Sequence, residues 1–65
     1  MDDTETARRA EHLRIEHRDL DAAIEALRAV TNPDEVQIAR LKKRKLKLRD
    51  EIAMLEDMLV PDIIA

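Results

Sequence analysis

The chain has 65 residues, 42% of them charged, a formal net charge of −3, and no Cys, Gly, Ser, Phe, Trp or Tyr. Without Cys it can form neither a disulfide nor a thiolate zinc site, and a β-hairpin would lack its usual aromatic and glycine residues. A composition dominated by Ala, Leu, Glu, Arg and Lys instead predicts an all-α fold.

Length and hydropathy also suggest where such a chain works and how it is stabilised. No apolar stretch is long enough to span a bilayer, and the acidic N-terminus does not resemble an export signal. We therefore expect a cytoplasmic protein that does not insert into membranes. A chain of this size lies near the limit at which one core suffices, so a further partner surface is expected.

A first helix is predicted over about residues 4–30. Asp3 or Thr4 can cap its start beside Glu5, and the helix is expected to fade at Val30. Its apolar residues alternate spacings of three and four, which places them on one stripe of a 3.5-residue period. The stripe comprises Ala10, Leu13, His17, Leu20, Ile24 and Leu27.

A turn is predicted at residues 31–34, because this stretch contains the only internal helix breaker. Asn32 suits the N-cap of a following helix, and Pro33 suits its first position, where a missing N–H costs nothing. Glu35 would then stand at the third position and close a capping box.

The second helix is predicted over about residues 33–59. Pro61 cannot continue a helix, so residues 60–65 are expected to form a C-terminal tail. The second helix repeats the alternating spacing of the first. Its stripe comprises Ile38, Leu41, Lys45, Leu48, Ile52, Leu55 and Leu59.

The two stripes predict a single domain over residues 1–65, an antiparallel two-helix hairpin with coiled-coil-like packing. If the chain folds back at the turn, facing positions have residue numbers that add to about 65, and both stripes fit this rule. One continuous helix kinked at Pro33 is the alternative. We call the facing positions the seam, and its layers are Leu27/Ile38, Ile24/Leu41, Leu20/Lys45, His17/Leu48, Leu13/Ile52 and Ala10/Leu55.

A second set of apolar residues lies outside the seam and predicts self-association. Small alanines permit close helix approach, so two hairpins forming a four-helix bundle, a homodimer, are expected. The alternative is that Leu46 and Ile15 are isolated exposed apolar residues. The set comprises Ala39, Leu46, Ala53, Met54, Met58 and Val60 on the second helix and Ile15, Ala22, Ala23, Ala26, Ala29 and Val30 on the first.

Two polar residues interrupt the aliphatic seam near its middle. His17 is one turn from Asp21, and Lys45 can extend its stem over Leu20 and place its ammonium near Asp21. A structural cluster of His17, Asp21 and Lys45 is therefore predicted. The alternative, a metal pair at an i, i+4 spacing in either histidine-containing turn, supplies too few ligands for a closed site.

No catalytic constellation accompanies these histidines. His12 and His17 have no adjacent thiol, and the threonines have capping or remote positions. We therefore expect no enzymatic activity, no cofactor and no metal.

The segment at residues 40–49 carries seven basic side chains and no acidic one. It predicts a basic central band that binds an unidentified protein partner, or alternatively nucleic-acid phosphates. Nucleic acid is disfavoured because aromatic stacking residues are absent and the net charge is negative. The candidate partner-binding residues are Arg40, Lys42, Lys43, Arg44, Lys47 and Arg49.

The hairpin register also predicts charge pairs beside the seam. Opposite charges are expected to meet in two of them and like charges in two others, which would then face a partner. The attractive pairs are Asp21/Lys42 and Arg28/Glu35, and the repulsive pairs are Arg14/Arg49 and Glu16/Glu51.

Two segments resemble the YdcH-like family of small bacterial proteins of unknown function. They read EHRDLDAAI at residues 16–24 and IARLKKRKLKLRDEI at residues 38–52, and the second carries the more specific motif, KKxKLxL(K/R)DEI, with Arg49 in place of Lys. The resemblance covers both predicted helices. It implies a bacterial, cytoplasmic helical hairpin, and it brings no reaction, cofactor or partner with it.

Overall fold

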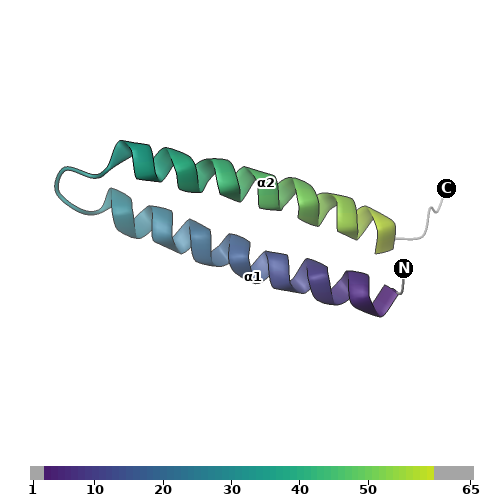
Figure 1. Cartoon of the computed structure of the whole chain (residues 1–65). Coiled ribbons are helices and arrows are strands. Elements are labelled where there is room, and N and C mark those ends of the chain that lie inside the picture. The colour runs from purple at the N-terminus through teal and green to yellow at the C-terminus, as the bar shows by residue number, and fades with distance from the viewer. Residues whose placement is uncertain (1–2, 60–65) are drawn as a thin grey trace, which may run out of the picture.

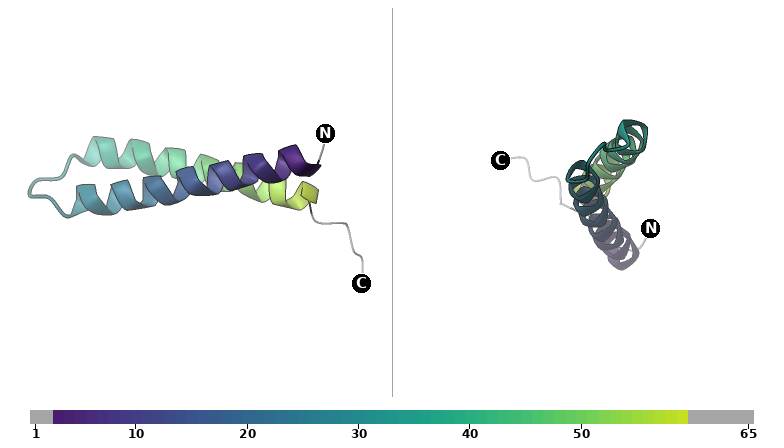
Figure 2. Two further views of the ribbon diagram at one scale, coloured as in Figure 1. Left: turned by 90° about the horizontal axis from the view of Figure 1, so that it is seen from below. Right: turned by 90° about the vertical axis from the view of Figure 1, so that its left-hand side faces the viewer.

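The computed structural model describes residues 3–59, which form two antiparallel helices lying side by side (Figure 1). Helix α1 spans Asp3–Arg28 and α2 spans Glu35–Leu59, and no strand occurs among the described residues. The molecule is a rod of 50 × 23 × 15 Å whose helix axes are inclined to each other (Figure 2). The predicted all-α hairpin is confirmed, and the single kinked helix is wrong.

The core is the predicted seam. None of its residues is exposed: six apolar residues are buried, and the others have intermediate exposure. Ala10, Leu13, Leu48 and Leu55 form one buried cluster, against which Leu20 and Ile52 pack. Apolar burial along a single stripe therefore fixes which faces of α1 and α2 meet. The buried apolar residues are Ala10, Leu13, Ile24, Ile38, Leu48 and Leu55.

One buried residue was missing from the predicted stripe. Thr6 is only 3% exposed and lies four residues before Ala10, so it continues the same spacing toward the start of α1. Its number adds to 65 with that of Leu59, the last seam position of α2. Thr6 was not predicted because its side chain is polar, although its spacing from Ala10 places it on the stripe.

The second set of apolar residues stays largely uncovered within one chain. Leu46 is 49% exposed and Ile15 is 47% exposed, while Met54, Met58 and Val30 are more than half exposed. Self-association through these residues stays a prediction. The remaining members are the exposed Ala22, Ala26, Ala29, Ala39 and Ala53, the partly exposed Ala23, and Val60, which lies outside the described residues together with the predicted tail.

The turn is longer than predicted, because the first helix ends earlier and the second begins later than expected. Helix α1 stops at Arg28 instead of Val30, where the amide of Ala29 donates to the carbonyls of Glu25 (3.2 Å) and Ala26 (3.3 Å). Helix α2 begins at Glu35 instead of Pro33. The connection is therefore longer than the four residues expected.

The predicted N-cap and capping box are wrong. The Oδ1 atom of Asp34 accepts hydrogen bonds from the amides of Val36 and Gln37, both at 3.1 Å, and the Asp34 carbonyl accepts the amide of Ile38 at 3.0 Å. These contacts make Asp34 the N-cap. Asn32 instead adopts a φ of 56°, a left-handed conformation that asparagine tolerates and that turns the chain.

Replacing Asp34 is expected to destabilise the hairpin. Asp34→Ala removes the acceptor for two amides of the first turn of α2, and loss of such a cap lowers the free energy of unfolding by about 0.5–2 kcal/mol. Urea unfolding followed by far-UV circular dichroism measures the change. Asp34→Ser should retain most of the stability, and Asn32→Gly should cost little because it preserves the left-handed turn. A neutral Asp34→Ala would contradict this assignment.

Candidate functional site

The charged residue inside the seam, Lys45, binds Asp21 as predicted. Its Nζ atom lies 2.9 Å from Oδ1 of Asp21, and its side chain is 27% exposed, whereas that of Asp21 is 57% exposed. The hydrogen bond and the positive charge of Lys45 lower the pKa of Asp21 below its ordinary value, with smaller contributions from the charges of His17 and Arg28. The stem of Lys45 thus occupies the seam while its ammonium stays near water.

His17 contributes to the predicted cluster only through its small effect on the pKa of Asp21. It is partly buried in the seam, but within residues 3–59 it forms neither a hydrogen bond nor an ion pair. Instead it lines a cavity of about 350 Å³ between the helices, together with residues of both. The structure therefore joins Asp21 to Lys45 and leaves the imidazole of His17 uncommitted.

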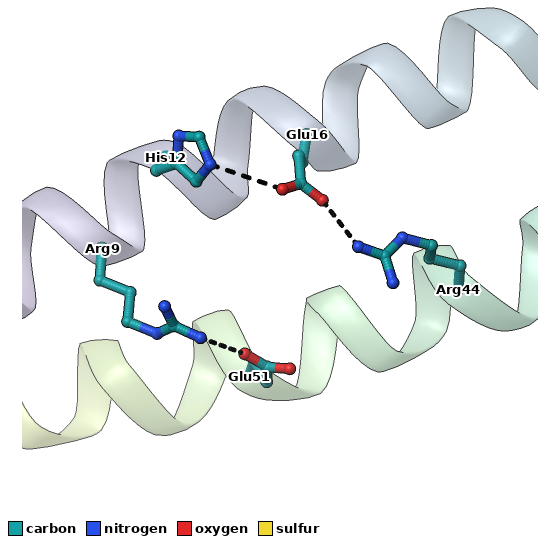
Figure 3. Close-up of polar contacts among 5 residues, drawn as sticks. All are labelled: Arg9, His12, Glu16, Arg44 and Glu51. Atoms are coloured by element: carbon teal, nitrogen blue, oxygen red, sulfur yellow. Dashed lines mark hydrogen bonds and ion pairs between the residues drawn. The ribbon is translucent and has the colours of Figure 1, made fainter.

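Ion pairs between the helices line one flank of the seam, formed by residues that immediately precede seam positions (Figure 3). Arg9 Nη2 lies 3.5 Å from Glu51 Oε2, and Arg44 Nη2 lies 3.2 Å from Glu16 Oε2. His12 Nε2 approaches the other oxygen of Glu16 at 3.5 Å. Along this flank the sign of the charge alternates on each helix, and each charge meets its opposite on the facing helix.

On the opposite flank Arg14 links the two helices. Its Nε and Nη2 atoms donate to Oε2 of Glu56 at 3.1 and 2.6 Å, and its Nη1 atom donates to Glu11 at 3.0 Å. The hydrogen bonds that Arg14 donates to Glu56 and Glu11 raise the pKa of Arg14 above its ordinary value. Arg14 is therefore fully engaged by two carboxylates.

Neither predicted attractive pair beside the seam forms within residues 3–59. Of the residues in the predicted repulsive pairs, Arg14, Glu16 and Glu51 bind opposite charges on the facing helix instead of facing a partner, whereas Arg14 and Arg49 do border one cavity. In the ion pairs observed between the two helices, the residue numbers do not add to about 65. They add to 60 for Arg9/Glu51 and Glu16/Arg44, and to 70 for Arg14/Glu56. The observed pairs are thus displaced along the helix axis in both directions from the seam register. The lean of side chains toward the N-terminus of their own helix favours the sum of 70 and does not explain the sums of 60. Opposite charges at these displaced positions were the signal that the prediction missed. Arg28 pairs with Glu25 on its own helix.

The six candidate partner-binding residues do not share one surface. Arg40, Lys43, Arg44 and Lys47 follow the i, i+3, i+4, i+7 spacing of one helix face and line a depression of about 310 Å³. We call these four residues the basic face. Lys42 does not line that depression, and Arg49 lines the other cavity, beside His17.

Among the described residues, one member of the basic face is neutralised by a carboxylate. Arg44 pairs with Glu16, whereas Arg40, Lys43 and Lys47 form no ion pair with any residue between 3 and 59. The basic face therefore has free positive charge available for another molecule.

Within residues 3–59 there is neither a cluster of metal ligands nor a membrane-spanning helix. Over residues 3–59 there is no group of three or more His, Cys, Asp or Glu side chains that could hold a metal ion. Neither described helix contains an apolar window suited to crossing a membrane.

The pair between Asp21 and Lys45 is expected to make stability depend on pH. Because the folded-state pKa of Asp21 is lowered, the stabilisation is complete above the unfolded pKa of about 4 and is lost as the pH falls through the folded value. From about pH 7 to about pH 3, thermal unfolding should show a larger loss for wild type than for Asp21→Asn. Asp19→Asn, which removes an unpaired carboxylate of α1, should behave like wild type. Equal pH dependence in wild type and Asp21→Asn would refute the assignment.

Comparison with known proteins gives a family and no activity. No curated protein and no solved structure matches the chain. A family profile described as "Protein of unknown function (DUF465)" matches residues 11–56, which include the turn and most of both helices. Because this match covers well over half of the chain, the protein belongs to the DUF465 family of proteins of unknown function.

Proposed function

We propose that the chain is a non-enzymatic interaction module: a hairpin that pairs with a second copy of itself and presents its basic face to an acidic protein. The observation that carries the proposal is the basic face, where four cations line one depression and three of them have no ion pair within residues 3–59. The YdcH-like motif at residues 42–52 supports assignment to that branch of the family and a bacterial, cytoplasmic setting.

The spacing of the basic face fits an acidic helix. From Arg40 to Lys47 the four side chains cover two helical turns, about 10 Å along the axis. An acidic helix that repeats Glu or Asp at the same spacing can oppose them, and complementary charge accelerates encounter. A nucleic-acid partner is less well supported, because the sequence has no aromatic side chain to stack on a base and a net charge of −3.

Self-association is supported by a stripe of exposed small and apolar residues on α2. Ala39, Leu46 and Ala53 recur every seven residues on one side of α2, and all three are exposed in the single chain. Since every seven residues return to the same helix face, the stripe can pack against another helix. A second copy related by a twofold axis covers the same stripe on both chains.

An antiparallel pair of α2 helices centred on Leu46 brings opposite charges together along one of its two edges. Lys43 precedes Leu46 by three residues and Asp50 follows it by four. In this arrangement Lys43 of each copy lies beside Asp50 of the other. Neither residue forms an ion pair within residues 3–59. On the other edge Lys42 and Arg49 of the two copies oppose each other, so burial of Leu46 is the main attraction.

The oligomeric state tests self-association. Size exclusion coupled to light scattering should report a dimer for wild type at micromolar concentration and a monomer for Leu46→Gln, which removes the central apolar contact without changing charge. Ile15→Gln is the matched control, because Ile15 is almost equally exposed on the other helix, and it should remain dimeric. A monomeric wild type would rule out self-association.

Binding of a fluorescent acidic helical peptide tests the basic face. At low salt we expect saturable binding, and Arg40→Gln/Lys47→Gln, which leaves Lys43 in place for the proposed dimer contact, should weaken it by about 2- to 30-fold, as expected for loss of two exposed ion pairs. The control Lys42→Gln/Arg49→Gln removes the same charge outside the basic face and should leave the affinity nearly unchanged. Binding of a short DNA duplex but not of the peptide would favour the nucleic-acid alternative, and equal weakening by both variants would contradict the proposal.

A further inference from the structure

A second positively charged site lies between the two helices, on the flank opposite to that of Figure 3. The cavity of about 350 Å³ that contains His17 receives side chains from both helices. Neither helix alone could form it, so it exists only because the hairpin is closed. Its lining residues are Arg14, His17 and Arg18 from α1 and Arg49, Ile52 and Glu56 from α2.

The charges around this cavity do not cancel. Glu56 is occupied by two hydrogen bonds from Arg14, so these two residues neutralise each other. Arg18 and Arg49, contributed by opposite helices, form no hydrogen bond or ion pair with any residue from 3 to 59, and neither does His17. The cavity therefore presents two free guanidinium groups and one free imidazole ring, with an excess of positive charge.

These three side chains suit a tetrahedral oxyanion. A guanidinium group donates paired hydrogen bonds to phosphate oxygens, and two guanidinium groups from opposite walls can bind different edges of one phosphate. The imidazole of His17 can add a donor from the seam. Ile52 contributes an apolar wall beside them, against which the carbon skeleton of a phosphate ester can pack.

We propose that Arg18, Arg49 and His17 form a binding site for a phosphate group, carried either by inorganic phosphate or by a small phosphomonoester. A phosphate with a short carbon skeleton fits this open cavity. The site uses neither the basic face nor Leu46; Arg49 also borders the proposed dimer contact, whereas Arg18 and His17 belong to α1. Arg14 and Glu56 position the two helices and leave the phosphate to the free arginines.

Nuclear magnetic resonance of the two histidines tests this site. On titration of wild-type protein with inorganic phosphate at constant ionic strength, the ring signals of His17 should shift and saturate. Those of His12, which pairs with Glu16 on the other flank, should stay in place. Glycerol phosphate distinguishes the two sources: tighter binding than inorganic phosphate identifies an ester, and equal or weaker binding identifies the free ion. Shifts that grow linearly without saturation, or that are equal in both histidines, would overturn the proposal.

A pair of matched variants tests the arginines. Arg18→Gln/Arg49→Gln should weaken phosphate binding by at least about tenfold, because the charged hydrogen bonds of both guanidinium groups are lost. Arg40→Gln/Lys47→Gln removes the same net charge from the basic face and should bind like wild type. Circular dichroism checks that both proteins remain helical, and the single variant Arg18→Gln replaces the double variant if that one unfolds. Equal weakening in both variants would mean that net charge alone attracts phosphate and would refute the site.

Discussion

The structure depends on one apolar seam with a period of 3.5 residues, because the exposed ion pairs beside it stabilise the contact between the helices only weakly. Six apolar side chains are buried within it, and Ile24, at 2% exposed, is the most completely buried of the large ones. Most helical stability in proteins comes from packing of an apolar face, so the burial along the seam is what stabilises both helices. The position of every flanking charge, and hence both candidate surfaces, follows from the contact made by these few residues.

A repeating seam leaves the register ambiguous, and the flanking charges resolve it. Sliding one helix by seven residues would keep apolar positions opposite one another. It would also bring Glu16 toward Glu51 in one direction or Arg9 toward Arg44 in the other, replacing two attractive pairs by a repulsive one. Exposed pairs stabilise a fold weakly, with a typical contribution of about 0.2–1 kcal/mol each. Their effect on the free-energy difference between the observed register and a shifted one is larger, since each shifted register loses attraction and gains repulsion.

How much the sequence predicts varies with the range of the interaction. Periodicity alone located the seam and the pair between Asp21 and Lys45, because helix geometry determines which residues share a face. It failed at the turn, where Asn32 adopts a left-handed conformation and Asp34 is the cap, since Asn32 and Asp34, two residues apart, both suit an N-cap. It also failed on the flanks, where long arginine side chains reach a partner displaced along the axis. Residue type alone specifies neither the position of the N-cap nor the pairing of the flanking charges.

The same geometry explains why the basic segment is not simply neutralised. Of its seven cations, Arg44 and Lys45 stand close enough to the seam to reach carboxylates of α1. The other five have no acidic partner within residues 3–59. Arg40, Lys42, Lys43 and Lys47 are exposed on α2, whereas Arg49 lines the cavity to which both helices contribute. A hairpin can satisfy only charges whose side chains reach a carboxylate across its single seam. The remaining charge is left for other molecules, and in this chain it divides between an open helix face and an open cavity lined by both helices.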